Sequence, residues 1–181
     1  MKEFKTECMD NVSGFERTNI TLFSLQKNTI EQFTDFTKDL ICELYYAMEA
    51  IDEKKLCALL QDLQKSKRVF VYGHGHASTL CSYVQNELSA KGKETVICDV
   101  DFAKKYVFYE SDILIIISIN GNTFHFEKEV IQNILNCSVN TWLISCKKNI
   151  DFSEKFLYIP TIKEKYNAII LRHMIDFILL H

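Results

Sequence analysis

The sequence predicts an α/β fold: a doubly wound parallel sheet of five strands, preceded by N-terminal helices. Two short apolar runs, 68–72 and 112–118, each end at a glycine-containing turn and are followed by apolar residues at helical spacing. The centre of the second run is apolar without a break, as expected of a strand buried on both faces of a parallel sheet. Strand-like and helix-like segments then alternate to the end of the chain, which is typical of a doubly wound sheet.

Two helices are expected before the first strand. Between Thr29 and Ala50, apolar residues recur at the spacing of one helix face, which predicts a long amphipathic helix. Asp52 is a suitable N-cap for a second helix, which runs to about Leu63 and ends in the basic segment 65–68. The chain before this region is the least regular part and has too few apolar positions for a core of its own.

The remaining elements are expected to alternate. Strands are predicted at 68–72, 94–98, 112–118, 139–145 and 155–159. Helices are predicted at 77–91, 101–108, 123–136 and 163–180, with a helical turn near Phe152. The last helix is apolar on nearly every side, which is typical of a helix buried all round. In a small domain this requires packing against another subunit, so we expect a homodimer.

Composition and charge limit the classes of function. The chain of 181 residues is the size of one domain, and its 48% hydrophobic content can fill one core. A net charge of -3 and a pI near 6.0 argue against a nucleic-acid surface on this chain, because such surfaces are usually basic. No apolar run is long enough to cross a membrane, and the first residues do not form a signal peptide. We therefore expect a cytoplasmic protein without a membrane partner.

The 7 cysteines do not form a metal-binding pattern. They show no C-x-x-C spacing and no histidine at ligand distance, which argues against a metal site. Most of them lie within apolar runs, where cysteine behaves as a small hydrophobic residue. An odd number of cysteines in a reducing compartment indicates free thiols. We expect neither a metal nor another cofactor.

Two turns form the candidate binding site. Gly73, His74 and Gly75 follow the strand at 68–72, and a second turn follows Ser118. Turns at the carboxyl ends of parallel strands face one crevice, where open α/β sheets bind ligands. Glycine lets the main chain take a positive φ or approach a ligand closely, and the N–H groups of the following helix favour an anion. For the glycine pair by itself, the alternative is a turn that only connects strand to helix.

These residues resemble a SIS (sugar isomerase) domain over the chain from about Asp52 to the C-terminus. The resemblance rests on the order of elements, on the strand ending in Gly73-His74-Gly75, and on Ser118-Ile119-Asn120-Gly121-Asn122-Thr123, where the family has Ser-x-Ser-Gly-x-Thr. Within the superfamily, the chain is most similar to the effector domain of RpiR-type transcriptional regulators, which share the 112–118 run and a terminal Asp before apolar residues, here Asp176. The resemblance implies a flavodoxin-like SIS fold, a homodimer and a sugar phosphate bound in the crevice.

The segment 9–17 resembles the end of the helix-turn-helix domain of these regulators, where a recognition helix passes into a Gly-Phe turn and a last helix. We therefore expect residues 1–27 to be a remnant of that domain and residues 28–181 to form the phosphosugar-binding domain. The earlier helices are absent, so the chain is expected to be either a fragment of a regulator or a regulator that has lost its DNA-binding part. DNA is an expected partner only if the missing helices are present in the full protein.

The chain departs from the family at two positions of the phosphate cradle. The serine four residues after the first glycine is Ala77 here, and the second serine of Ser-x-Ser-Gly is Asn120. A hydroxyl can donate to a phosphate oxygen and alanine cannot, whereas Asn120 still donates through its amide. His74 and His76 either add charge or move a sugar proton, or they are partly exposed loop histidines. The expected ligand-binding residues are Gly73, His74, Gly75, His76, Ser78, Ser118, Asn120, Gly121 and Thr123.

Three functions remain open. The first is the phosphosugar-sensing domain of an RpiR-family regulator. The second is a phosphosugar aldose–ketose isomerase, for which the resemblance offers Glu87 and His173 as catalytic candidates. For these two residues, a solvent-facing helix carboxylate and a core or interface histidine are the alternatives. The third function is a dimer scaffold without a ligand, because Ala77 and Asn120 both alter the cradle.

Overall fold

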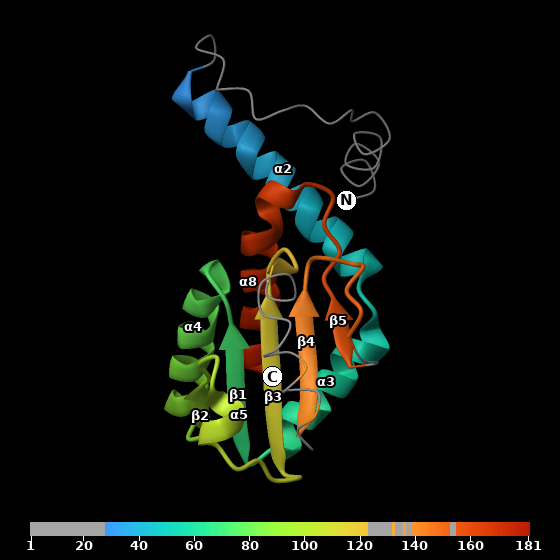
Figure 1. The fold of residues 1–181 in the computed structure, drawn as a ribbon. Coiled ribbons are helices and arrows are strands. Elements are labelled where there is room, and N and C mark those ends of the chain that lie inside the picture. The colour runs from blue at the N-terminus through green and yellow to red at the C-terminus, as the bar shows by residue number, and fades with distance from the viewer. Residues whose placement is uncertain (1–27, 123–131, 133–135, 137–138, 153–154) are drawn as a thin grey trace.

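The computed structural model of the protein describes residues 28–122, 132, 136, 139–152 and 155–181. The expected remnant at 1–27 lies outside the described residues, as do nearly all of the expected helix at 123–136 and the candidate site residue Thr123. In the described part, one sheet carries helices on its faces, and the first helix, α2 (Thr29–Ala50), extends beyond them (Figure 1).

Five parallel strands form the sheet, as the sequence predicts. They are β1 (Arg68–Gly73), β2 (Glu94–Ile97), β3 (Asp112–Ser118), β4 (Asn140–Ser145) and β5 (Phe156–Tyr158). Their order is β2-β1-β3-β4-β5, and each neighbouring pair runs parallel. β3 is the central strand and is buried along its whole length, which confirms the interpretation of its apolar run.

A polar N-capping residue precedes each of the first two helices. α2 has the predicted bounds, and Asn28 and Glu31 form a capping box at its start. α3 (Glu53–Lys65) follows Asp52, whose carboxylate accepts a hydrogen bond from the Lys55 N–H at 3.1 Å, as predicted. The later helices are α4 (His76–Ala90), α5 (Phe102–Lys105), the 3₁₀ turn η1 (Glu164–Tyr166) and α8 (Asn167–Leu180).

The short helix predicted after β2 is wrong in its second half. α5 ends at Lys105, and Tyr106 takes an extended conformation with φ -118° and ψ 142°. The chain leaves the helix because the next aromatic side chains pack on Phe70: the ring centroids of Tyr106 and Phe108 lie 5.5 and 4.7 Å from that of Phe70. Burying these rings stabilises the fold more than another turn of a short helix would. The helical turn expected before β5 is also absent from residues 149–152.

Alternate residues of the strands pack into two core layers. The first layer contains Val69, Val71, Ile113, Ile115, Ile117, Trp142 and Ile144, covered by α3, α4, α8 and the end of α2. The second layer contains Phe70, Tyr72, Leu114, Ile116 and Leu143, which pack against Phe102 of α5 and the aromatic residues after it. Side chains of a strand alternate between its faces, so Ser118 of β3 and Ser145 of β4 continue the second layer.

Two acidic residues of α2 hold the segment that leads into α8. The carboxylate of Glu43, 2% exposed, accepts hydrogen bonds from the main-chain N–H groups of Ile162 and Lys163 at 2.8 and 2.9 Å. Burial raises the pKa of the Glu43 carboxyl, and these two N–H groups oppose the rise. One turn earlier, Asp39 accepts from Lys163 Nζ at 2.8 Å and from Tyr166 Oη at 3.4 Å. The C-terminal half of α2 is therefore joined to the same body as the sheet.

Within a single chain, α8 is buried on one side only. Its inner side packs in the first core layer, whereas Ile169, Phe177 and Leu180 are 40%, 38% and 77% exposed. The sheet and α4 cover only part of the helix surface, so the burial of its outer side by another subunit stays a prediction.

The cysteines differ from the prediction at one position. Cys57, Cys81, Cys98 and Cys146 carry free thiols, and burial raises the pKa of the last three to about 12. Cys42 is disulfide-bonded, so the prediction of free thiols is wrong there. An odd total excludes complete pairing but not a single bond, which is why composition missed it. Within the described ranges, no helix combines the length and the apolarity needed to span a membrane.

Candidate functional site

The carboxyl ends of β1 and β3 form the candidate site. After β1 the chain passes to β2 on one side of the sheet, and after β3 it passes to β4 on the other, so the strand order reverses between β1 and β3. Open α/β sheets leave a crevice for ligands at such a point. Gly73 pairs with Ile117 in the register, which places the turn after β1 beside Ser118. The two turns singled out from the sequence thus lie side by side at one edge of the sheet.

The two glycines of the first turn are required for different reasons. Gly75 precedes α4 at φ 58°, a conformation that residues with a side chain rarely adopt. At Gly73 the requirement is steric: a Cβ there would lie 2.9 Å from Cys81 Sγ and 3.0 Å from Ala77 Cβ. Gly73 therefore lets α4 pack closely against β1.

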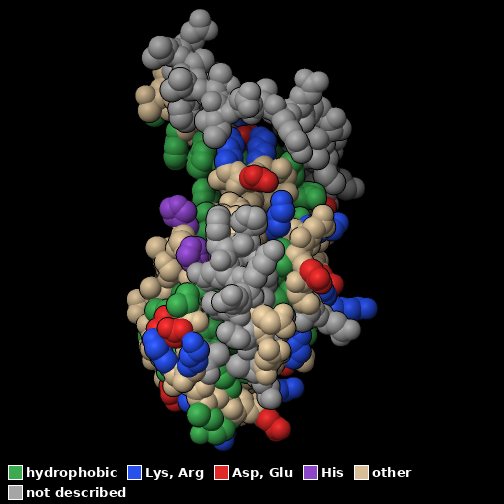
Figure 2. Space-filling model, in the orientation of Figure 1, with side chains coloured by type: hydrophobic (Ala, Val, Ile, Leu, Met, Phe, Trp, Pro, Cys, Tyr) green, Lys and Arg blue, Asp and Glu red, His purple; other side chains and the backbone are tan. Residues whose placement is uncertain are grey.

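The side chains at the start of α4 lie in different surroundings. His74 and His76 are exposed, and histidine side chains appear in Figure 2 at the level where the strands end. Ala77 is 2% exposed and packs in the first core layer, so this position is directed toward the core. The Ser78 hydroxyl donates to the main-chain oxygen of Gly75 at 2.7 Å and is thereby engaged within the turn.

Among the residues of this edge, Ser118 gives the clearest indication of a ligand site. It is 1% exposed, and its hydroxyl has no hydrogen-bond partner among the described residues. A buried hydroxyl without a partner costs about 1–3 kcal/mol, so such a group calls for an explanation. Ser145 is its register partner on β4; it is 0% exposed, and its Oγ accepts from the Lys147 N–H at 3.0 Å. Two buried hydroxyls therefore lie on adjacent strands at the carboxyl edge.

The loop after β3 is tied to the start of α8. Asn120 Oδ1 accepts a hydrogen bond from Asn167 Nδ2 at 2.7 Å, and Asn167 Oδ1 accepts from Thr161 Oγ1 at 2.6 Å. Asn167 is 4% exposed, so this pair of amides fixes the orientation of the Asn120 side chain. The Nδ2 group of Asn120 then remains as the donor that can reach a ligand. Gly121 follows with φ 78°.

Sequence reasoning missed three residues of this edge. Ser145 and Lys147 come from β4 and the segment after it, where no glycine turn drew notice; a serine that closes a buried strand, as Ser118 does, was the available signal. Tyr72 lies within the strand predicted at 68–72 and is not among the expected ligand-binding residues. It is 3% exposed, and in the described part of the chain its hydroxyl also lacks a partner. Tyr72 and Ser118 are on the same face of adjacent strands.

The two catalytic candidates do not join this edge within one chain. Glu87 is half-buried on α4, eleven residues after His76, which places it about 16 Å along the helix axis from the glycine turn. His173 is exposed on α8, six residues after Asn167, or about 9 Å along that axis.

The groups at the edge are hydrogen-bond donors suited to an anion. They are buried hydroxyls, an amide and main-chain N–H groups, and donors of this kind bind the oxygens of a phosphate. Across the described ranges, no group of three or more His, Cys, Asp or Glu side chains is placed to hold a metal ion.

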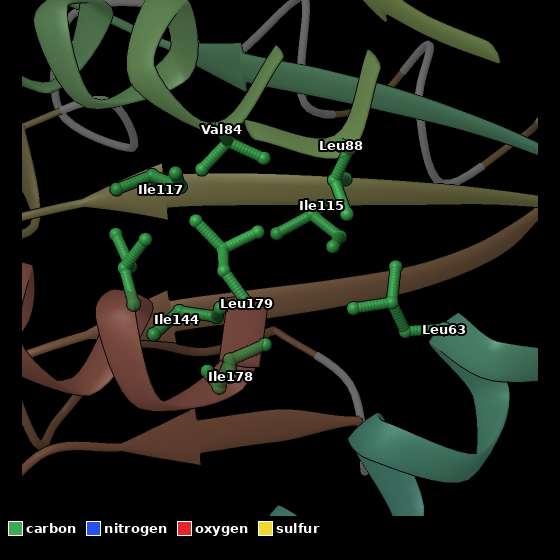
Figure 3. Close-up of a pocket in the computed structure, with 9 residues that line it drawn as sticks. Leu63, Val84, Leu88, Ile115, Ile117, Ile144, Ile178 and Leu179 are labelled. Atoms are coloured by element: carbon green, nitrogen blue, oxygen red, sulfur yellow. The ribbon is translucent and has the colours of Figure 1, made fainter. Parts of the chain in front are cut away.

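The small apolar pocket in Figure 3 is separate from this edge. Its volume is about 10 Å³, and side chains of α3, α4, α8 and the first core layer line it, among them Leu63, Val84 and Ile115. Such a space is too small for an organic ligand, and its apolar lining offers a water molecule no partner. It is a packing void of the core.

Solved structures identify the fold. The Vibrio vulnificus NanR protein, complexed with ManNAc-6P, matches 86% of this chain with a TM-score of 0.67 and 15% identity, and the match covers 62% of that chain. The sugar isomerase domain of an RpiR transcription factor from Sphaerobacter thermophilus matches 86% with a TM-score of 0.65 and 12% identity, over 89% of its length. A protein from Listeria monocytogenes, provisionally named a sugar-phosphate isomerase, matches 83% with a TM-score of 0.66 and 15% identity, over 86% of its length.

The fold of this chain is therefore the SIS-domain fold, as predicted, and both regulators and sugar-phosphate isomerases have it. No family model and no curated protein sequence matches the chain. At identities of 15% and below, the likeness establishes the fold, and the role depends on the site.

Proposed function

We propose that this chain binds a sugar phosphate, as the SIS domain of an RpiR-type transcriptional regulator. The observation that carries the proposal is the Ser118 hydroxyl, buried and without a partner in the described residues, at the edge where the turns after β1 and β3 meet. Phosphate oxygens accept hydrogen bonds, and Ser118 Oγ, Asn120 Nδ2 and the main-chain N–H groups of the turns donate them. A phosphate therefore satisfies the group that the unliganded fold leaves unsatisfied.

Two further observations support a regulator. Two of the similar structures are named as regulators, and one of these is complexed with ManNAc-6P. The segment 9–17 resembles the end of a helix-turn-helix domain. DNA binding requires the complete helix-turn-helix, so we assign it only to a protein that contains the missing helices. The cytoplasm, where such a protein meets its DNA, is the proposed location.

A phosphosugar aldose–ketose isomerase is the second candidate, because one similar structure is provisionally named a sugar-phosphate isomerase. Such an enzyme needs an acid or a base within hydrogen-bond reach of the reacting sugar atoms. Glu87 and His173 lie along α4 and α8, away from the Ser118 edge in the same chain. The binding role therefore fits this site better than the enzymatic one.

Isothermal titration calorimetry with N-acetylmannosamine 6-phosphate, glucose 6-phosphate and fructose 6-phosphate tests the binding role. We expect saturable binding of at least one of them and none of the same sugar without phosphate, because the site recognises the oxyanion. The incubated mixtures should show no interconversion of aldose and ketose; turnover would favour the isomerase. If none of the three binds at millimolar concentration, a scaffold without a ligand is the better account.

We infer in addition that the chain forms a homodimer. On α2, Ile30, Phe33 and Met48 are 72%, 67% and 61% exposed, and on α8 Phe177 is 38% exposed. A second copy covering these helices removes this apolar surface from water. Light scattering at micromolar concentration should give twice the chain mass of 21.1 kDa, and Phe33→Ser should shift the equilibrium toward the monomer. A stable wild-type monomer contradicts the inference.

A further inference from the structure

Lys147 lies over the loop that follows β3. An ideal Cβ on Gly121 would lie 3.1 Å from Lys147 Cγ and 3.2 Å from Lys147 Cβ, so the stem of the lysine occupies the space that any larger residue would need. Gly121 also has φ 78°, which disfavours a side chain independently. The glycine therefore allows a lysine from the segment after the neighbouring strand β4 to pack across the loop of the candidate site.

Two hydrogen bonds hold the main chain of Lys147 in this place. Its N–H donates to Ser145 Oγ at 3.0 Å, and the preceding N–H, of Cys146, donates to the main-chain oxygen of Ile119 at 3.2 Å. Ser145 is the register partner of Ser118, whose hydroxyl is buried and unpartnered in the described part. The base of the lysine side chain is thus fixed close to the group that the proposed phosphate would satisfy.

Within the described residues, the Lys147 ammonium forms no ion pair. The ion pairs found there involve other cations, namely Arg68, Lys104, Lys105, Lys155, Lys163, Lys165 and Arg172. Lys147 is exposed, so its ammonium is hydrated while its stem packs on the loop. Because the stem is already held, less side-chain entropy is lost when the ammonium binds an anion.

We propose that the Lys147 ammonium binds the phosphate of the sugar phosphate together with Ser118, a role that rests on the proposed function. The cradle has no hydroxyl at Ala77. An ammonium supplies three N–H donors and a full positive charge, and lysine binds phosphate as a point charge. The binding edge then includes residues at the ends of three adjacent strands, β1, β3 and β4, and the lysine adds a positive charge that the hydroxyl, amide and main-chain donors do not carry.

Substitution at two neighbouring lysines tests this role. Lys147→Met removes the charge and keeps most of the stem, Lys147→Arg keeps the charge, and Lys148→Met makes the same charge change one residue further along. In calorimetry with whichever of the three hexose 6-phosphates binds the wild type best, Lys147→Met should weaken binding about tenfold or more, the effect of one charged hydrogen bond. Lys148→Met should change the affinity by less than about twofold, as expected of an exposed charge. Lys147→Arg should stay near the wild type.

The outcomes separate this role from the proposed function. If the wild type binds and the two methionine variants bind equally well, the role of Lys147 is refuted while sugar-phosphate binding stands. If Lys147→Arg loses as much affinity as Lys147→Met, the loss does not come from charge and the role is again refuted. If the wild type binds none of the phosphates, both proposals fail.

Discussion

Replacing Ser118 with alanine should stabilise the unliganded protein and weaken ligand binding. The hydroxyl is buried and, in the described residues, makes no hydrogen bond, so its desolvation costs about 1–3 kcal/mol that the empty site does not offset. Removing one oxygen atom leaves a small void that costs only a few tenths of a kcal/mol, roughly. The net expectation is a gain of about 1–2 kcal/mol, or about 2–8 °C in Tm for a chain of this length.

Ser145→Ala is the matched control. The two serines are register partners with the same burial, but Ser145 Oγ accepts from the Lys147 N–H at 3.0 Å. Its loss should therefore destabilise the protein, by about 0.5–1.5 kcal/mol. Urea unfolding and thermal unfolding without phosphate measure both variants, and calorimetry with a hexose 6-phosphate measures binding. We therefore expect the two substitutions to change the unfolding free energy in opposite directions.

One result would refute the reasoning. If Ser118→Ala lowers Tm in the absence of ligand as much as Ser145→Ala does, the Ser118 hydroxyl has a structural partner and is not reserved for a ligand. A Ser118→Ala variant that binds the sugar phosphate as tightly as the wild type would equally exclude Ser118 from the site.

Three further predictions concern the fold. Burial would raise the pKa of Asp62, but hydrogen bonds, the largest from Lys155, lower it to about 2. A carboxyl whose pKa falls on folding stabilises the fold at every pH above the pKa that it has in the unfolded chain. About 1 kcal/mol of unfolding free energy should therefore be lost as the pH falls from about 4 to 2. Asp62→Asn should remove this pH dependence in urea unfolding. Gly73→Ala should destabilise by about 1–3 kcal/mol in the same assay, because its Cβ would overlap the start of α4. Asp112→Asn should lower the free energy of unfolding by about 2–3 kcal/mol in thermal unfolding. The reason is that Asp112 is 2% exposed and receives two hydrogen bonds from Arg68, at 2.6 and 3.0 Å. A change below about 0.5 kcal/mol would contradict this expectation.

The sheet and the first helices could be predicted because apolar runs and the spacing of apolar residues along the chain indicate them. The run at 112–118 is β3 residue for residue, and the apolar period between Thr29 and Ala50 gives the bounds of α2. The end of α5 could not be predicted in this way. It depends on Tyr106 and Phe108 meeting Phe70, a contact that only the folded sheet creates.

For the candidate site, the position of the two turns could be predicted from the sequence, whereas the surroundings of the side chains could not. The glycines at 73, 75 and 121 mark the edge, since each answers a steric or backbone requirement. The unpartnered state of Ser118 and the packing of Lys147 on Gly121 follow from the register of β3 and β4, which periodicity does not fix. Sequence reasoning therefore found the loops and missed the neighbouring strand that completes them.

Glu43 determines where this domain can be shortened. The family resemblance begins at about Asp52, and a chain shortened to that point would lack α2. Such a chain would leave the N–H groups of Ile162 and Lys163 without their acceptor and would open the core at Ala47. The smallest stable expression product should therefore begin before Asp39, so that the C-terminal half of α2 is retained.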